Sequence, residues 1–71
     1  MAQKTEQPGE REVYFELIAI GGSVKVTAID SGTGIEVSVV GPASAAQADL
    51  ERLALQKLKV RLAREAAGNR Q

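Results

Sequence analysis

The chain has 71 residues, with nine Lys and Arg side chains, nine Asp and Glu side chains, and neither Cys nor His. The lack of Cys excludes disulfides, thiolate zinc sites, iron–sulfur clusters and cysteine nucleophiles, and the lack of His removes the commonest proton shuttle and metal ligand. A domain of this size buries only about 60% of the surface of its unfolded chain, and its core rarely supplies more than about 3–5 kcal/mol. Self-association is a natural way to add burial.

The first eleven residues, MAQKTEQPGER, show no targeting segment, because they contain neither an apolar core nor a small-residue cleavage site, and we predict that they form a disordered N-terminal tail. The longest strongly apolar stretches, Val13–Ile20 and Ile35–Val40, fall well short of the roughly 20 residues that a membrane-spanning helix needs. We therefore expect a soluble, cytoplasmic protein that has no contact with membranes.

Three strands are predicted after the tail. The first, Glu12–Ile20, is rich in β-branched and aromatic residues and stops at a Gly-Gly pair, which accepts the positive φ angles of a tight hairpin turn. The second, Ser23–Asp30, ends at the loop Ser31–Gly34, and the third, Ile35–Val40, precedes a Gly-Pro pair that should end it.

The two predicted hairpins choose the same buried face. If the Gly-Gly pair forms the first turn, Ile20 lies opposite Ser23; if residues 31–34 form the second loop, Asp30 lies opposite Ile35. A shift of one residue would turn the whole apolar set toward solvent, so this agreement predicts an antiparallel meander in the order 1-2-3. The shared face carries Phe15, Leu17, Ala19, Val24, Val26, Ala28, Val37 and Val39.

A long helix is predicted from about Ser44 to Ala67. Ser44 and Gln47 have the spacing of a capping box, strong helix formers follow, and Gly68 stands where a C-terminal cap is expected. The fold class is therefore α+β, a three-stranded meander followed by one helix on one face (βββα), with the domain over residues 12–67 and a frayed end at 68–71. A helix of this length, about 36 Å, should overhang strands of about 26 Å.

The predicted helix has two apolar faces. The broader arc, suited to docking on the sheet, is formed by Leu50, Ala54, Leu55, Leu58 and Leu62. A narrower stripe lies nearly opposite, with a spacing of seven residues, and consists of Ala46, Leu53, Val60 and Ala67. One sheet cannot cover both faces, so we predict that the second stripe is a dimer interface. The expected intramolecular core is Phe15, Leu17, Val26, Val37, Leu58 and Leu62.

The predicted sheet also leaves surfaces open. Both outer strands of a three-stranded meander have unpaired backbone edges, and its outer face mixes apolar side chains such as Ile18 and Val40 with charged ones. Together with the two-faced helix, these edges indicate a non-enzymatic homodimer, in which the helix or a terminal strand could be exchanged between protomers. An unknown protein partner is the related option.

The charges are unevenly distributed. Residues 1–50 carry three basic and seven acidic side chains, whereas residues 51–71 carry six basic and two acidic ones. Three interpretations remain open: a solvated helix with cations near its C-terminus, head-to-tail complementarity between protomers, and an anionic partner. The alternative function is therefore a small nucleic-acid-binding accessory protein, although the basic side chains do not form a single stripe. Its candidate contacts are Arg52, Lys57, Lys59, Arg61 and Arg64.

No catalytic, cofactor or metal site is predicted, and no small-molecule substrate is evident. Gly32-Thr33-Gly34 lies between two strands instead of opening a helix, which favours a hairpin loop over a dinucleotide-binding turn. Glu16 and Glu36 share the outer face but lie roughly 12 Å apart by strand spacing, too far for a glycosidase pair. We therefore expect a protein that is not an enzyme.

The central segment resembles a known family. Residues Glu12 to Ala46, and above all the run VKVTAID and the strand exit GIEVSVVGP, are similar to short uncharacterised bacterial proteins that are grouped as a domain of unknown function. The resemblance covers about half of the chain. It implies a soluble bacterial protein with a βββα core, and it carries no activity or functional residues to this sequence.

Overall fold

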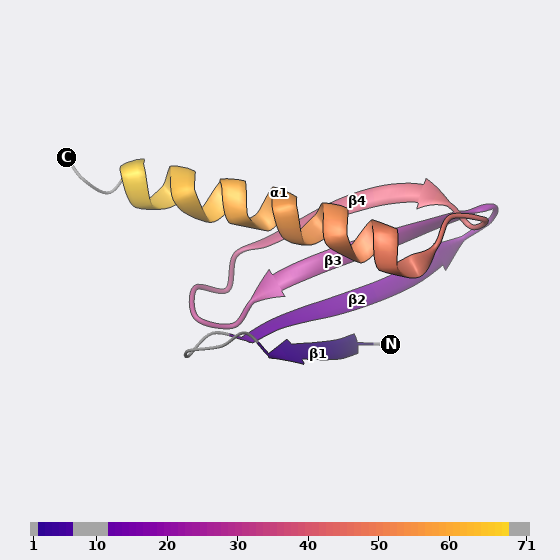
Figure 1. Ribbon diagram of the computed structural model, residues 1–71, viewed down its shortest axis with the longest axis horizontal. Helices are drawn as coiled ribbons and strands as arrows, with labels where there is room; N and C mark the ends of the chain where they lie inside the picture. Colours follow the sequence, from indigo (N-terminus) through magenta and orange to yellow (C-terminus); the bar gives the residue numbers. More distant parts are fainter. Residues whose placement is uncertain (1, 7–11, 69–71) are drawn as a thin grey trace.

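A four-stranded antiparallel sheet with one helix across one face makes up the protein (Figure 1). The computed structural model describes residues 2–6 and 12–68. In chain order the elements are β1 (Ala2–Glu6), β2 (Glu12–Ile20), β3 (Ser23–Asp30), β4 (Glu36–Pro42) and α1 (Gln47–Gly68), and the strand order in the sheet is β1-β2-β3-β4. The predicted α+β class, with a three-stranded meander followed by one C-terminal helix, is confirmed by β2, β3, β4 and α1.

The predicted register of both hairpins is confirmed. In the first, Ile20 pairs with Ser23 and Phe15 with Ala28; the tight turn between the strands has Gly21 at a φ of 58°. In the second, Ala28 pairs with Val37. The alternation of apolar and polar residues therefore sets the register, because only this pairing keeps the apolar side chains on one face.

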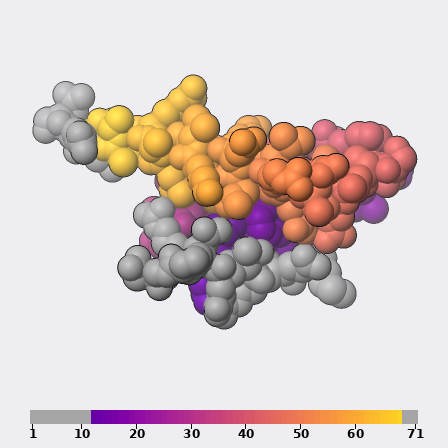
Figure 2. Space-filling model, viewed as in Figure 1, coloured from indigo at the N-terminus to yellow at the C-terminus, as the bar shows by residue number. Residues whose placement is uncertain are grey.

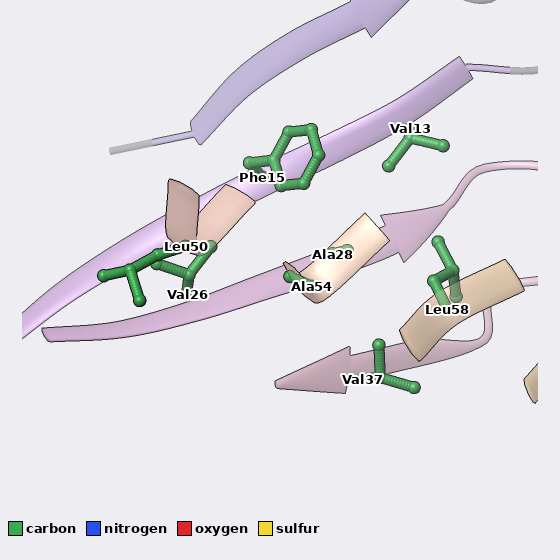
Figure 3. Close-up of a cluster of buried hydrophobic side chains, with 8 residues drawn as sticks. All are labelled: Val13, Phe15, Val26, Ala28, Val37, Leu50, Ala54 and Leu58. Carbon is green, nitrogen blue, oxygen red and sulfur yellow. The ribbon is translucent and has the colours of Figure 1, made fainter. Parts of the chain in front are cut away.

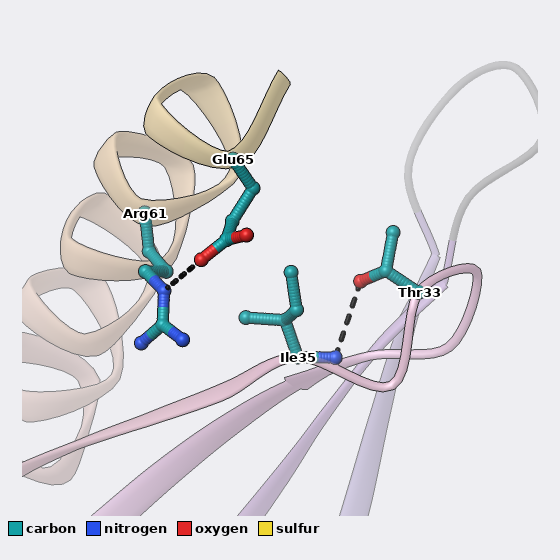
Figure 4. Close-up of polar contacts among 4 residues, drawn as sticks. All are labelled: Thr33, Ile35, Arg61 and Glu65. Carbon is teal, nitrogen blue, oxygen red and sulfur yellow. Dashed lines mark hydrogen bonds and ion pairs between the residues drawn. The ribbon is translucent and has the colours of Figure 1, made fainter. Parts of the chain in front are cut away.

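The loop between β3 and β4 is organised by a buried carboxylate. Asp30 is fully buried, and its Oδ2 accepts hydrogen bonds from the backbone N–H (3.0 Å) and the Oγ1 (2.8 Å) of Thr33. The Oγ1 of Thr33 accepts in turn from the N–H of Ile35 at 3.1 Å (Figure 4). Gly34 has a φ of 78°, a conformation that is strained for other residues. Local hydrogen bonds thus shape this hairpin loop.

The prediction of a disordered tail is wrong for residues 2–6. These residues form β1, which pairs antiparallel with β2 from Ala2 opposite Glu16 to Glu6 opposite Glu12. An edge strand of this kind is held by backbone hydrogen bonds to an open neighbour, and hydropathy does not report such bonds. The remaining positions of the predicted tail, residues 1 and 7–11, lie outside the described residues, as do 69–71 of the predicted frayed end.

The boundary between β4 and α1 also differs from the prediction. The strand extends through Pro42, which is compatible with an edge strand, and Ala45 N–H then donates to Pro42 O at 2.9 Å in a turn. Ser44 therefore lies in the turn and not at the helix start. The first hydrogen bond of the helix runs from the N–H of Leu50 to the carbonyl of Ala46, at 3.2 Å. The helix ends at Gly68, one residue later than predicted.

The core lies between α1 and the inner face of the sheet (Figure 3). Burial of Phe15, Val26, Val37 and Leu58 confirms four of the six predicted core residues. Leu17 and Leu62 are only partly buried and pack against this core. The buried set is completed by Val13, Ala28, Leu50 and Ala54.

Two features fix how α1 sits on the sheet. At Gly41 of β4, a side-chain Cβ would lie 2.5 Å from Cδ2 of Leu50, so the absence of a side chain allows the first turn of α1 to approach the strand closely. At the other end, Leu58 is the last fully buried residue, and residues 63–68 are all exposed. The C-terminal turns of α1 therefore extend past the sheet, as the predicted overhang requires (Figures 1 and 2).

Candidate functional site

The second apolar stripe of α1 is exposed to solvent in the single chain. Leu53 keeps 52% and Val60 55% of its surface exposed, and Ala46 and Ala67 at the two ends of the stripe are exposed as well. The broad arc behaves differently, since Leu50, Ala54 and Leu58 face the sheet and are buried. The helix therefore does present two apolar faces, and its own sheet covers only one of them.

The stripe faces the β4 edge of the sheet. The ammonium of Lys57, which lies between Leu53 and Val60 on the same side of α1, donates to the backbone carbonyl of Ser38 in β4 at 2.8 Å. The opposite flank of the helix, at Leu55 and Leu62, packs toward the rest of the core. Leu53 and Val60 consequently lie beside the outer strand and point away from the sheet centre.

Strand β4 leaves a row of backbone groups unpaired by β3. At the two ends of their ladder, Ala43 N–H donates to Gly22 O at 2.8 Å and Asp30 N–H donates to Ile35 O at 2.9 Å. Antiparallel ladders alternate between hydrogen-bonded and non-hydrogen-bonded pairs, so every second residue of β4 turns its N–H and C=O outward. These outward residues are Glu36, Ser38 and Val40. The contact from Lys57 covers one of their carbonyls.

The outer face of the sheet carries a smaller apolar group. Ile18 is 49%, Ile20 56% and Val40 66% exposed. Lys25 pairs with both Ile18 and Val40 and so places a charge between them. Sequence reasoning identified this face as mixed but did not include Ile20, the last residue before the turn.

The five basic residues proposed to contact an anionic partner do not act as one group. Arg52 pairs with Asp49 at 3.2 Å, and Arg61 pairs with Glu65 at 2.9 Å (Figure 4). Lys57 is bound to the β4 edge. The remaining two candidates, Lys59 and Arg64, are exposed and form no ion pair within the described part of the chain.

Within residues 2–6 and 12–68 the structure brings together no group of three His, Cys, Asp or Glu side chains that could hold a metal ion. The phenol of Tyr14 donates to Oε1 of Glu12 at 2.9 Å, and the hydroxyls of Thr27 and Ser38 form a 2.7 Å hydrogen bond across β3 and β4. These contacts join neighbouring strands or residues of one strand. The helix at residues 47–68 does not combine the length and the apolar character needed to cross a membrane.

Sequence reasoning found the stripe but missed its position. The heptad spacing of Leu53 and Val60 was visible in the sequence, whereas their location above an open strand edge depends on which flank of α1 meets β4. The hydrogen bond from Lys57 to Ser38, between residues 19 positions apart, has no sequence signal. The combined surface consists of an apolar helix face next to backbone donors and acceptors of β4 that β3 does not pair.

Comparison with known proteins identifies a family. No curated protein and no solved structure matches the chain. A family known as a domain of unknown function, DUF6898, matches residues 10–65, which include three of the four strands, the Gly-Pro exit and most of the helix. The chain therefore belongs to the DUF6898 family.

Proposed function

We propose that this protein is a non-enzymatic interaction protein that works as a homodimer, with the second stripe of α1 as the contact between subunits. The observation that carries the proposal is the exposure of Leu53 and Val60, both about half exposed on a helix whose other face is buried in the core at Leu50, Ala54 and Leu58. Burying large aliphatic side chains of this kind yields about 1.5–3 kcal/mol for each complete burial. A domain with so small a core benefits from that gain.

The stripe is complementary to itself when two copies of α1 run antiparallel. A two-fold axis at the midpoint between Gln56 and Lys57 places Leu53 of one copy against Val60 of the other. The same axis brings Asp49 opposite Arg64, so opposite charges meet on each side of the apolar centre. Both residues are exposed, and Arg64 forms no ion pair among the described residues. This match supports a second copy as the occupant of the stripe.

The small residues at the ends of the stripe are consistent with the same pairing. Ala46 and Ala67 are equally distant from the proposed axis and therefore face each other across it. Small side chains at these positions let two helices remain close over the whole seam, as the repeat of seven residues requires. The contact then extends over about three heptads of each helix.

The solution mass tests the proposal. Because one chain has a mass of 7.5 kDa, a dimer is expected at about twice that value in sedimentation equilibrium at micromolar concentration, with dissociation on dilution. The measurement should be repeated at low and high salt, since the Asp49–Arg64 pairs contribute less at high ionic strength. A mass of one chain at every concentration up to the millimolar range would reject self-association.

A further inference from the structure

We infer that the open edge of β4 and the stripe of α1 form one composite surface, which joins two copies into a continuous sheet. This inference rests on the proposed homodimer and specifies its geometry. In it, β4 pairs antiparallel with β4 of the second copy about a two-fold axis at Ser38, and the two helices pack side by side above the junction. Two four-stranded sheets thereby become one sheet of eight strands.

The outward backbone groups of β4 are arranged to pair with a second strand. Its outward N–H and C=O groups at Glu36, Ser38 and Val40 have the spacing that another antiparallel strand requires. With the axis at Ser38, the two Ser38 residues exchange backbone hydrogen bonds, and Val40 pairs with Glu36 of the second copy. The residues of β4 that face the helix, Val37 and Val39, would then continue the core side of the sheet across the junction.

The position of α1 on the sheet sets the distance between the two helices in the proposed dimer. Helix α1 packs on β3 and β4, so its axis lies about half a strand spacing inside β4. Neighbouring strands are about 4.8 Å apart, so the two-fold axis lies about 2.4 Å outside β4 and about 4.8 Å from the helix axis. The two helices would thus be about 9.6 Å apart, within the 8–10 Å typical of packed helices. Pairing the strands therefore brings the stripes into contact without moving either helix.

The alignment of α1 along β4 is the third observation that supports this dimer. The hydrogen bond from Lys57 to Ser38 aligns the centre of the stripe with the centre of the open edge. A two-fold axis at Ser38 therefore passes close to Lys57, which is the position required to place Leu53 against Val60. Strand pairing and helix pairing choose the same axis independently, as expected if both surfaces belong to one interface.

In this arrangement, Lys57 blocks the edge of β4 in the single chain and leaves it when the dimer forms. In the single chain its ammonium occupies the carbonyl of Ser38, which is how lysines protect open strand edges from unwanted pairing. In the dimer, that carbonyl accepts the N–H of Ser38 from the second copy and the ammonium returns to solvent. Since β4 has only one open edge, pairing by a two-fold axis closes the assembly at two copies.

The outer face of the sheet is a weaker candidate for the same partner. Its exposed apolar residues, Ile18 and Val40, are separated by Lys25, whose charge would have to be desolvated in a face-to-face contact. At the edge of β4 and the stripe, the flexible stem of Lys57 lets its ammonium leave the Ser38 carbonyl and return to solvent when the strands pair, so no charge is trapped in the contact.

The proline variant Val40→Pro tests edge pairing. It removes only an N–H that faces away from β3, and the Val40 side chain is exposed, so the fold is expected to persist. The loss of two symmetry-related inter-subunit hydrogen bonds, one from each copy, and the bulk of the ring should raise the dissociation constant of the dimer at least about tenfold. The matched control Val40→Ala keeps the N–H and should change it by less than about threefold. Equal dissociation constants for the two variants would overturn edge pairing and leave the homodimer standing.

Single-cysteine cross-linking gives an independent measurement, because the natural chain has no Cys. Oxidised Ser38→Cys should form a disulfide-linked dimer, since hydrogen-bonded antiparallel residues have Cα atoms about 5.5 Å apart. Gln56→Cys should also cross-link, whereas the control Lys25→Cys on the outer face should not. Cross-linking at 56 without cross-linking at 38 would overturn edge pairing and retain helix pairing. Failure at both positions, with the mass of a single chain, would overturn the homodimer as well.

Discussion

Replacing Leu53 and Val60 together by Glu is expected to convert the dimer into a folded monomer. Each of these side chains is about half exposed in the single chain, so the substitutions leave the core between α1 and the sheet intact. In the dimer they would place four carboxylates in the apolar seam, where desolvation and mutual repulsion oppose association. We expect the dissociation constant to rise at least about a thousandfold, equivalent to about 4 kcal/mol, in sedimentation equilibrium.

The matched control for this variant is Ala48→Glu with Ala66→Glu. Both alanines are exposed on α1 but lie outside the stripe, so the control adds the same charge to the same helix. Its dissociation constant should equal the one expected for the proposed dimer of the unmodified chain. A folded dimer of the Leu53→Glu, Val60→Glu variant would show that the interface is elsewhere. An unfolded chain would indicate helices exchanged between protomers, because an exchanged helix folds only together with its partner.

Leu58→Ala is expected to have the largest effect on stability. Leu58 is fully buried in the centre of the contact between α1 and the sheet. Truncating such a leucine lowers the free energy of unfolding by about 2–5 kcal/mol. A core of this size rarely supplies more than about 3–5 kcal/mol in total, so the loss is comparable to the whole stability of the domain. The variant should therefore be largely unfolded by far-UV circular dichroism at 37 °C, or should unfold at much lower urea than the natural chain.

The matched control for Leu58 is Leu53→Ala, the same truncation on the same helix at a half-exposed position. Measured at concentrations where the chains are monomeric, it should reduce the free energy of unfolding by less than about 1 kcal/mol. The control keeps the helix propensity of the substitution constant, so the difference between the two variants reports burial. Equal losses at 53 and 58 would contradict the assignment of the two helix faces.

Much of this fold could be predicted because its patterns are local. Alternation over β2, β3 and β4 fixes both hairpin registers, and the helix carries its apolar arc in the spacing of Leu50, Ala54 and Leu58. Strand β1 could not be predicted, because its pairing with β2 depends on backbone groups that every residue has. The start of α1 was placed too early, since Ser44 has the chemistry of a helix cap but is held in a turn after Pro42.

The candidate site was predictable only in part, for a geometric reason. A repeat of seven residues reveals that Leu53 and Val60 lie on one side of a helix, but it does not say which strand lies next to them. That information comes from how α1 docks, which the close contact of Leu50 with Gly41 and the hydrogen bond from Lys57 to Ser38 determine. Both contacts join residues that are distant in the sequence, so no local pattern encodes them.

An isotope-filtered nuclear Overhauser experiment on a mixture of labelled and unlabelled chains tests directly whether a second copy covers the stripe. Leu53 and Val60 are separated by about 10.5 Å along one helix, so a strong cross-peak between their methyl groups must come from two different molecules. We predict such cross-peaks, with others between the side chains of Asp49 and Arg64. Filtered spectra without any contact at Leu53 or Val60, in a sample whose helix is fully formed, would contradict the claim that a second copy covers this face.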